Sequence, residues 1–429
     1  MNAMFKSVIR TILEGYVRQY LRRHPEVKLV IVTGSVGKTS TKNAIGTVLS
    51  EKFRVRMHTG NHNAELSAPL AILGIEYPDN LRSPSVWRDV FRQARQKVTA
   101  PDDVEVIVQE VGSDRIGQVP HFGTYAHPDI AVVSAVSPEH MEYFKTIEAV
   151  AAEELAPAKF SKQVLVNQDD IDPAYIKRLA PDARTYGLTS KAAYHFKPGK
   201  FSLSSGYEGE FHAPELDESL NAKIQLVGTH NIRPAVAAGA VGAMLGMSST
   251  EIKRGLAAIR PVAGRMQVLK GKNNSTILDD TYNSSPLATA AALQTLYELG
   301  GSQKIAVLGS MNELGEASPE AHRTLGKLCD PKQLDFVVTV GNEARTYLAP
   351  EAEKRGCRVV SFMAAPDAGE FVKAHMKKGA VLLFKGSQGG VFLEEAVKVV
   401  LASPKDAPKL VRQSAAWMKQ KQAFFKSVQ

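Results

Sequence analysis

The sequence predicts an α/β protein, and three observations lead to this prediction. Short apolar runs alternate with helical stretches, which is typical of a parallel sheet covered on both faces. The length of 429 residues suits two or three domains, and 44% hydrophobic with 23% charged residues is ordinary for a globular chain. A glycine-containing turn joins the first apolar run to a helix. We therefore expect a P-loop central domain with a mostly parallel sheet, followed by a second α/β domain.

The net charge of +9 is concentrated at the two ends of the chain. Residues 1–28 carry six basic and two acidic side chains, and residues 404–429 carry six basic and one acidic. Between these two ends the numbers of basic and acidic side chains are equal. This balance argues against nucleic-acid binding by the main part of the chain. Cys329 and Cys357 form no CxxC pair, and the chain shows no secretory segment. This indicates a reducing cytoplasm without disulfides or structural zinc, and no apolar run is long enough to span a bilayer.

Residues 1–27 are predicted to form a basic amphipathic helix. From Met4 to Leu21 apolar residues recur at helical spacing with Lys and Arg between them, and Gly15 weakens the pattern. Two interpretations stay open. The helix packs on the following domain, or it docks on an anionic membrane surface and makes the protein membrane-associated.

The central domain is expected over residues 28–263. Its strands are predicted from apolar runs at residues 27–33, 104–110, 129–137 and 163–167. Residues 194–227 instead carry short alternating segments with Gly and Pro, which predict a small antiparallel excursion. A helix rich in Ala and Gly is expected from Asn231 to Gly246.

The second α/β domain is expected over residues 264–403. Its strands are predicted at residues 275–280, 304–310, 335–341 and 380–387. Ser318, Pro319 and Glu320 supply an N-cap, a proline at the first helical position and an early acid, so a helix should begin there. Residues 404–429 are expected to be a basic tail that forms a surface helix, with partner docking left open.

A phosphate-binding loop is predicted where residues 33–40 read TGSVGKTS between a strand and a helix. Backbone N–H groups and the helix N-terminus can cradle phosphate oxygens there. Lys38 would reach the β and γ phosphates and Thr39 would ligate Mg²⁺. Thr33 stands where the usual pattern has glycine, so the loop is a shortened variant. The residues expected to hold ATP are Gly34, Ser35, Val36, Gly37, Lys38, Thr39 and Ser40.

Two further residues could hold a metal. Glu110 closes an apolar run, and a carboxylate at the C-terminal end of a strand can face the phosphate loop. His140 follows another predicted strand, although a lone histidine is more often structural than a ligand.

Nine motifs occur in the order found in the Mur ligases, and the chain resembles that family over about residues 28–400. The motifs are TGSVGKTSTK, TGNHNAELSAPLAILG, QEVGSDRIGQV, SPEHMEYF, GTHNIRPAVAAGAV, PVAGRM, DDTYNSSP, GSMNELGEASPEAHR and KGS. Within the family they are most similar to the ligases that add D-Ala-D-Ala to a UDP-muramoyl tripeptide, without the usual N-terminal UDP-binding domain.

The resemblance implies an ATP-dependent, amide-forming ligase of peptidoglycan precursor synthesis with a Rossmann-like C-terminal domain. ATP phosphorylates an acceptor carboxylate, an amine attacks the acyl phosphate, and ADP and phosphate leave. The implied cofactors are ATP and Mg²⁺. The implied partners are a carboxylate acceptor, for example a UDP-muramoyl peptide, and an amino acid or dipeptide. No nucleic acid is implied, and a monomer is expected.

The family pattern also implies roles for individual residues. Lys38 is assigned to the ATP phosphates, Thr39 and Glu110 to one Mg²⁺, and His140 to a second, so that two metals can hold the carboxylate against the γ-phosphate. Most members carry a carbamylated lysine at the position of Glu154. We hypothesise that Glu154 supplies a permanent carboxylate to the second metal instead, with a water bridging its shorter reach.

The remaining assignments concern the nucleotide and the substrates. Asn231 and Asn283 resemble adenine-site residues, and Arg265 and Asp280 resemble nucleotide contacts that couple the domains. Outside the ordered motif set, these residues would be interpreted as caps or surface charges, and Lys385 as the end of a strand. The residues expected to meet the acceptor or the amine are Asn61, Asn63, Asn312, Glu313 and Lys385.

Two other departures from the family concern the acceptor. Ser67 stands where the family commonly has glycine, and it would be strained if the backbone there needs a positive φ. Only about 28 residues precede the phosphate loop, so recognition of UDP is the part of the resemblance with least support. The alternatives are a ligase with a polyglutamate, folate-like or lipid-linked acceptor, and a P-loop NTPase that switches a partner. Phosphate release that requires both carboxylate and amine distinguishes a ligase from a switch.

Overall fold

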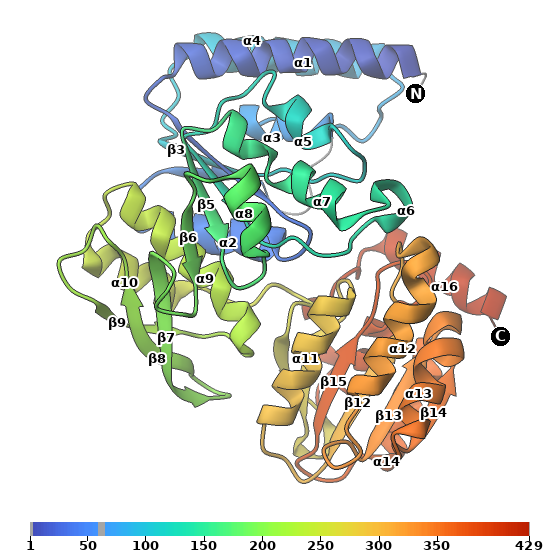
Figure 1. The fold of residues 1–429 in the computed structure, drawn as a ribbon. Coiled ribbons are helices and arrows are strands. Elements are labelled where there is room, and N and C mark those ends of the chain that lie inside the picture. Colours follow the sequence, from blue (N-terminus) through green and yellow to red (C-terminus); the bar gives the residue numbers. More distant parts are fainter. Residues whose placement is uncertain (1–2, 59–64, 429) are drawn as a thin grey trace. The chain divides into compact units, whose positions relative to one another are not determined.

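The computed structural model describes residues 3–58 and 65–428, and Figure 1 shows its elements. The chain divides into two compact units, which are described separately below. Unit 1 comprises residues 1–137, 143–225 and 232–260, and unit 2 comprises residues 138–142, 226–231 and 261–429. Both units contain a sheet flanked by helices, so the predicted α/β class with two sheets is confirmed.

Unit 1 is built on a nine-stranded sheet in the order β2-β3-β1-β4-β5-β6-β7-β8-β9. Its strands are β1 (Lys28–Thr33), β2 (Val55–Met57), β3 (Val106–Glu110), β4 (Ile130–Val133), β5 (Gln163–Asn167), β6 (Arg184–Gly187), β7 (Tyr194–Ser202), β8 (Gly206–His212) and β9 (Leu220–Ile224). Neighbours from β2 to β7 run parallel, and β7, β8 and β9 run antiparallel. The four predicted apolar strands and the antiparallel excursion are therefore confirmed.

The central strands of unit 1 are buried on both faces, which explains their continuous apolar sequences. Every residue of β3 and β4 is buried, and so is every residue of β1 after Lys28. The strands that the sequence did not predict, β2 and β6, are short and carry Arg56 and Arg184 among their few residues. Such segments lack the apolar run on which the prediction depended.

Among the described residues, ten α-helices lie wholly or partly in unit 1. They are α1 (Ala3–Arg23), α2 (Lys38–Leu49), α3 (Ser67–Leu73), α4 (Pro84–Thr99), α5 (Gln118–Phe122), α6 (Met141–Phe144), α7 (Ile147–Glu154), α8 (Pro173–Leu179), α9 (Thr229–Met244) and α10 (Ser249–Ala258). The predicted helix rich in Ala and Gly is α9. Ser67 begins α3 without a positive φ, so the strain considered for a serine at this position does not arise.

Helix α1 packs on unit 1 along one face. Ile9, Leu13 and Val17 are at most 1% exposed, and Tyr20 Oη donates a hydrogen bond to Asp102 Oδ2 at 3.0 Å. Gly15 does not interrupt the helix. The packing interpretation of the N-terminal helix is therefore confirmed for this face, while its other face is exposed to solvent.

Unit 2 contains a six-stranded sheet in the order β10-β11-β15-β12-β13-β14. Its strands are β10 (Gln267–Lys270), β11 (Thr276–Asp280), β12 (Lys304–Gly309), β13 (Phe336–Val340), β14 (Val359–Phe362) and β15 (Val381–Lys385). Only β10 runs antiparallel to its neighbour. The four predicted strands of this domain are confirmed, and their apolar side chains form a buried core with α14 and α15.

The helices of unit 2 cover both faces of its sheet (Figure 1). They are α11 (Pro286–Glu298), α12 (Ser318–Leu328), α13 (Ala349–Lys354), α14 (Ala365–His375), α15 (Glu394–Val400) and α16 (Ala415–Val428). The predicted cap of α12 is wrong. Ser318 is the first helical residue rather than the cap, and its hydroxyl contacts Glu343 Oε2 and lies 3.2 Å from His322 Nδ1.

The basic tail forms the predicted surface helix, α16, and a few of its side chains anchor it to unit 2. Lys421 of α16 is 1% exposed, although it is a lysine in a polar segment. Phe424 and Phe425 lie 5.4 and 6.2 Å from the ring of Phe392, measured between ring centroids. None of the helices in the described part of the chain combines the length and the apolar character needed to cross a bilayer.

Candidate active site

The phosphate-binding loop connects β1 to α2 in unit 1. Gly34 has φ 126° and Gly37, which precedes the first residue of α2, has φ 88°. A Cβ placed on Gly34 would lie 2.2 Å from Ser134 Oγ, so both the backbone conformation and the space require glycine there. The backbone of the loop therefore lies in direct contact with the segment that follows β4.

Serine hydroxyls fix the shape of this loop. Ser134 Oγ lies 2.9 Å from Thr33 O and 2.6 Å from Val36 O, so it contacts both sides of the turn. Ser35 N donates to Ala135 O at 3.0 Å, and Ser35 Oγ accepts the backbone N–H of Ser137. Ser35 was among the residues expected to hold ATP, whereas Ser134 was not expected, and its only signal in the sequence is its place directly after the buried strand β4.

Lys38 lies in the first turn of α2 and folds back over the loop. Its ammonium donates to Gly34 O and lies 3.4 Å from Ser35 O. Thr39 follows it and is 8% exposed. The cation expected to neutralise phosphate charge is thus held at the loop itself.

Sheet pairing places Glu110 beside this loop. It ends β3, which neighbours β1, and its residue in register on β1 is Val32. Since the C-terminal ends of parallel strands meet at one edge of a sheet, Glu110 and the phosphate loop share that edge. The carboxylate is 2% exposed, and Lys42 Nζ lies 3.9 Å from Glu110 Oε2. Burial lowers the pKa of Lys42, a residue that the sequence analysis did not select.

Glu154 ties the phosphate loop to the segment that follows Glu110. Its Oε2 accepts the backbone N–H of Gly34 at 2.6 Å, and its Oε1 accepts the Ser113 hydroxyl at 3.2 Å. Its backbone oxygen also accepts the Thr33 hydroxyl at 3.0 Å. The side chain is 2% exposed. A carboxylate at this position therefore has a clear role in shaping the loop.

The adjacent Glu153 has a different set of partners. Its two carboxylate oxygens accept the backbone N–H groups of Gly117 and Val119, each at 2.7 Å, at the start of α5. Burial raises the pKa of Glu153. Two neighbouring buried glutamates thus point to different segments, and only one of them contacts the phosphate loop.

The oxygen donors at this edge fit magnesium. Mg²⁺ prefers oxygen ligands and is usually held by one or two carboxylates together with phosphate and water. Thr39 and Glu110 provide a hydroxyl and a buried carboxylate at the loop. Among the described residues, no three His, Cys, Asp or Glu side chains gather as a metal site. The donor set therefore suits a metal that is bound together with a nucleotide.

His140 belongs to unit 2. It has φ 49°, and its Nδ1 lies 3.2 Å from Glu313 Oε2. The hydrogen bond with His140 holds the pKa of Glu313 below its ordinary value. The structure thus pairs the residue expected at the second metal with one expected at the amine.

Asp280 and Lys385 form a buried ion pair at the C-terminal ends of β11 and β15. Lys385 Nζ lies 2.7 Å from Asp280 Oδ2 and donates to Asn283 O at 2.8 Å. Lys385 is 1% exposed, and burial lowers its pKa. Asp280 Oδ1 also accepts the backbone N–H of Met266 at 3.1 Å. Lys385 therefore orders the segment around Asn283 rather than presenting its amine to solvent.

Arg265 lies over the ring of Tyr282. The distance from the guanidinium carbon to the ring centroid is 4.2 Å. Its Nε is buried and has no hydrogen-bond partner within the described chain. Since Arg265 and Asp280 were both expected near the nucleotide, this end of unit 2 brings together the residues assigned to that role.

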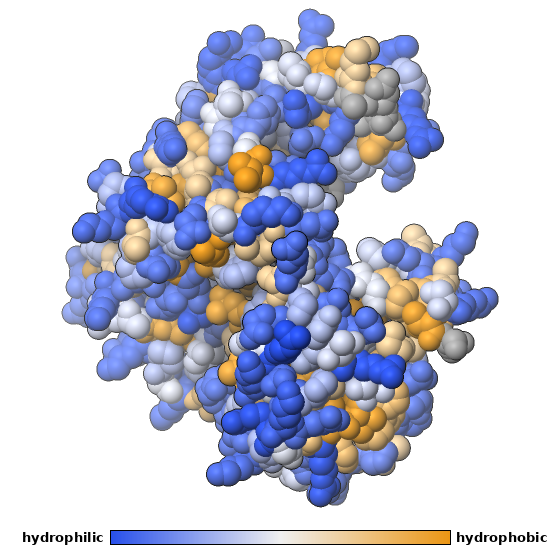
Figure 2. Space-filling view, turned by 45° about the vertical axis from the view of Figure 1, so that its right-hand side comes forward, coloured by the Kyte–Doolittle hydropathy of each residue, from blue (hydrophilic) through white to orange (hydrophobic). Residues whose placement is uncertain are grey.

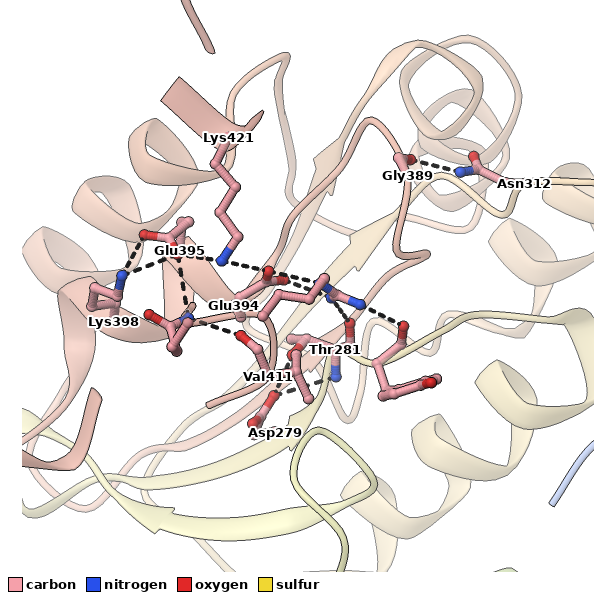
Figure 3. Close-up of polar contacts among 12 residues, drawn as sticks. Asp279, Thr281, Asn312, Gly389, Glu394, Glu395, Lys398, Val411 and Lys421 are labelled. Atoms are coloured by element: carbon pink, nitrogen blue, oxygen red, sulfur yellow. Dashed lines mark hydrogen bonds and ion pairs between the residues drawn. The ribbon is translucent and has the colours of Figure 1, made fainter. Parts of the chain in front are cut away.

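Arg412 from the basic tail fixes the same segment. Its guanidinium donates to the carbonyl oxygens of Thr281 and Tyr282 at 2.6 and 2.9 Å. It also forms an ion pair of 2.7 Å with Glu394, which is fully buried. Lys421 Nζ lies 2.8 Å from Glu394 Oε1 (Figure 3). The carboxylate of Glu394 therefore connects Lys421 to Arg412. Nothing local in the sequence indicates this contact.

The expected asparagines fall into three groups. Asn312 Nδ2 donates to Gly389 O at 2.6 Å, which Figure 3 shows within unit 2. Asn231 Nδ2 donates to Val227 O at 2.8 Å, so this amide is engaged by its own turn. Asn61 and Asn63 lie outside the described residues.

A cavity of about 580 Å³ opens in unit 1 beside the segment that follows Glu110. Basic and acidic side chains alternate around it, and Lys6 Nζ lies 2.8 Å from Glu65 Oε2 while His121 Nε2 lies 2.8 Å from Glu14 Oε1. Its further lining includes Arg10, Val111, Asp114, Arg115, Ile116 and Tyr125. Helix α1 therefore forms one wall of a cavity of mixed charge next to the phosphate edge.

Comparison with known proteins gives consistent matches over both units. Residues 32–242 match the Mur ligase middle domain, and residues 264–388 match the Mur ligase, glutamate ligase domain. The UDP-N-acetylmuramoyl-tripeptide--D-alanyl-D-alanine ligase of Bacillus subtilis is 29% identical over 405 residues, which cover 92% of this chain and 80% of that protein.

Solved structures agree with this result. MurF ligase from Thermotoga maritima in complex with ADP matches with a TM-score of 0.74 and 25% identity, covering 93% of this chain and 84% of that one. MurF from Acinetobacter baumannii matches with a TM-score of 0.74 and 23% identity, covering 90% of this chain and 79% of that one. The two family models together span the phosphate loop and most strands of both sheets.

Proposed function

Because the chain belongs to the Mur ligase family of ATP-dependent, ADP-forming ligases, we propose that it joins D-Ala-D-Ala to the peptide of a UDP-muramoyl tripeptide. The observation that carries this proposal is the edge of the unit 1 sheet, where the phosphate loop, Lys38 and Glu110 lie together. The choice of substrates is supported by the name of the relatives that match most of the chain.

In the first step, unit 1 binds ATP and directs its γ-phosphate at the acceptor. The backbone N–H groups between Gly34 and Thr39 and the N-terminus of α2 face the phosphates. The ammonium of Lys38 turns from the carbonyl oxygens of the loop to phosphate oxygens. Its positive charge keeps hydrogen-bond partners throughout this change. Mg²⁺ held by Thr39 and Glu110 would neutralise charge on the phosphates when it is bound. An acceptor carboxylate oxygen then bonds to the γ-phosphorus, and ADP leaves with the electrons of the broken P–O bond.

In the second step, the amine of D-Ala-D-Ala attacks the carbonyl carbon of the acyl phosphate. The tetrahedral intermediate loses inorganic phosphate and one proton, which leaves an amide. Unit 2 supplies residues for the nucleotide and the amine in this proposal. Arg265 and Asp280 lie at the segment that Lys385 and Arg412 fix. Asn312 and Glu313 would meet the incoming amine.

The cavity beside the segment after Glu110 is our candidate for the peptide part of the acceptor. Its alternating charges suit a peptide that carries carboxylates and an amine, because each charge of the ligand meets an opposite one. Lys6 and Arg10 lie 2.8 and 3.5 Å from Glu65, and both can turn from this carboxylate to one on the ligand. In this way α1 contributes to acceptor binding.

Phosphate release tests the proposed function. ATP and Mg²⁺ are supplied with UDP-muramoyl tripeptide, with D-Ala-D-Ala, with both and with neither. We expect release only with both, together with a product of the ligated mass. Release with neither substrate that rises when a protein or other macromolecule is added would indicate an NTPase switch. No release from a folded protein that binds ATP would contradict these substrates, and the same assay with polyglutamate, folate-like and lipid-linked acceptors would then identify another ligase.

A further inference from the structure

Helices α1 and α4 form a two-helix layer on the outside of unit 1. They lie side by side in Figure 1, and the rings of Tyr16 and Phe91 join them with 6.4 Å between centroids. The inner face of α4 is buried through Trp87, Val90 and Ala94. Each helix therefore has one face in the core of unit 1 and one face toward solvent.

The two helices of this layer together carry a large excess of positive charge. Helices α1 and α4 contain nine basic residues and only two acidic ones, Glu14 and Asp89, which gives +7 out of +9 for the whole chain. The exposed basic residues are Lys6, Arg18, Arg22, Arg23, Arg88, Arg92 and Arg95. The charge noted at the N-terminus in the sequence thus continues on a second helix.

Helical spacing aligns these arginines. Arg88, Arg92 and Arg95 are spaced to lie on one face of α4, and Arg18 and Arg22 are one turn apart on α1. In the described part of the chain, no carboxylate lies within ion-pair distance of Arg22, Arg88 or Arg95. Arg92 is paired only with Asp89, at 3.0 Å. Most of this charge is therefore available to an external anion.

An apolar row lies on the same layer. Met4, Val8 and Ile12 follow one another at intervals of four residues on α1, and they are 75%, 51% and 37% exposed. Figure 2 shows apolar surface bordered by hydrophilic side chains on the part of unit 1 formed by α1 and α4. Since contiguous exposed apolar side chains on a helix cost free energy in water, a partner that buries them is indicated.

We propose that the outer face of α1 and α4 docks on an anionic lipid bilayer. Aligned arginines suit lipid phosphates, and an apolar row bordered by basic residues is what an interfacial helix inserts below the headgroups. Nucleic acid would also attract the arginines, but Met4, Val8 and Ile12 offer neither hydrogen bonds to bases nor rings to stack on them. The combination of charge and aliphatic surface therefore favours lipid.

Docking through this layer leaves the catalytic residues of unit 1 on other elements. The phosphate loop and Glu110 lie at the edge of the sheet, and neither belongs to α1 or α4. The docking proposal therefore does not depend on which acceptor the ligase uses.

Vesicle co-sedimentation of the full chain tests the proposal. The vesicles consist of phosphatidylcholine alone or with about one third phosphatidylglycerol, at low and high salt. We expect binding only to the anionic vesicles, weakened by salt because the interaction is partly electrostatic. The variant Arg88→Gln/Arg92→Gln/Arg95→Gln should lower the partition coefficient on the order of 100-fold. The variant Met4→Ser/Val8→Ser/Ile12→Ser should also lower it, with a remaining salt dependence.

A matched control separates the layer from overall charge. Lys177, Lys191 and Lys200 are exposed lysines elsewhere in unit 1, and their triple glutamine variant should sediment like the wild type. Thermal unfolding and phosphate release in the absence of vesicles check that each variant is folded and active. Equal partition of wild type and the arginine variant would overturn the proposal. So would absence of binding to anionic vesicles, or preferential binding to duplex DNA in a competition with them.

Discussion

Glu154 Oε2 accepts a hydrogen bond from the backbone N–H of Gly34, with 2.6 Å between the nitrogen and the oxygen. The two residues are 120 positions apart in the chain, and the contact joins the end of α7 to the phosphate loop. A carboxylate oxygen has more than one lone pair, so this hydrogen bond leaves room for a metal. Loop bracing and metal binding are therefore compatible roles for Glu154, and they can be separated by substitution.

We expect Glu154→Gln to keep the loop in shape and to impair magnesium binding. The amide oxygen can accept the Gly34 N–H, and the amide nitrogen can donate to Ser113 Oγ, but the charge is lost. The Mg²⁺ concentration for half-maximal phosphate release should rise at least about tenfold, since one charge near a cation is worth more than 1 kcal/mol when buried. Glu153→Gln is the matched control, because it removes a similarly buried charge that faces the start of α5 instead of the phosphate loop. If Glu154→Gln requires the same Mg²⁺ concentration as the wild type, Glu154 only holds the phosphate loop in shape and does not bind the metal.

Gly34→Ala should abolish ATP binding. The new Cβ would lie 2.2 Å from Ser134 Oγ and 2.8 Å from Ala135 N, so the loop must move. We expect phosphate release to fall by more than 100-fold, on the scale seen when preorganised donors are lost. Gly246→Ala is the control, because Gly246 also has a positive φ, of 75°, but nothing lies within 4 Å of its Cβ position. Gly246→Ala should destabilise the protein by only about 1 kcal/mol. Normal ATP binding by Gly34→Ala would contradict the proposed role of the loop in holding the phosphates.

Lys6→Ala/Arg10→Ala should weaken acceptor binding selectively. Both side chains line the cavity beside the segment after Glu110. We expect KM for the acceptor to rise about tenfold, with KM for ATP unchanged, because a hydrogen-bonded charge contributes roughly 1–3 kcal/mol. Arg22→Ala on the same helix does not line the cavity and serves as control. If the KM for the acceptor is the same in the double variant and in Arg22→Ala, the cavity does not bind the acceptor. The proposed ligase function would not be affected by that result.

The stability of unit 2 should depend on pH through Asp279. Burial raises the pKa of this fully buried carboxyl from 3.8 to about 6. Because the folded state binds the proton more tightly, the stability that it contributes is present below pH 4 and is lost as the pH rises to 6. Asp279→Asn should therefore gain stability over wild type across this interval, by up to about 3 kcal/mol near pH 7. Urea unfolding at several pH values measures this, and a difference that does not vary with pH would contradict it.

Arg412→Lys should disturb the nucleotide segment of unit 2. Lysine keeps a charge near Glu394 but cannot donate to Thr281 O, Tyr282 O and the carboxylate together. We expect KM for ATP to rise several-fold while the melting temperature falls only slightly. Lys398→Ala is the control, because Lys398 contacts Glu395 and Met418 rather than the segment of Thr281 and Tyr282, and it is partly exposed. A large loss of stability without a change in KM would indicate a purely structural role.

Most of the fold could be predicted from the sequence because the central strands are buried on both faces. Continuous apolar runs such as residues 28–33 and 381–385 have no other simple interpretation once they alternate with helices. Strands β2 and β14 were not predicted, since they have only three and four residues and none of these is fully buried. Local chemistry also misled at Ser318, where a tertiary contact to Glu343 replaces the cap.

From local patterns, the part of the candidate site that could be predicted best is the one whose residues lie next to one another in the sequence. The phosphate loop is contiguous, so its strand, turn and helix can be recognised together. The bracing by Glu154 and the contact of Arg412 with Thr281 join residues more than 100 positions apart. No periodicity or composition links such pairs, and packing alone brings them together.

The shared carboxylate of Glu394 has a consequence for the synthesis of the chain. Domains generally fold as units during translation, starting from the N-terminus. Unit 1 has all of its residues once residue 260 has been made, whereas Glu394 is made before Arg412 and Lys421. Until both cations have followed, a nascent unit 2 would have to bury an uncompensated negative charge, which is strongly unfavourable. Unit 2 is therefore expected to remain open to proteases and chaperones on the ribosome until synthesis has passed Lys421.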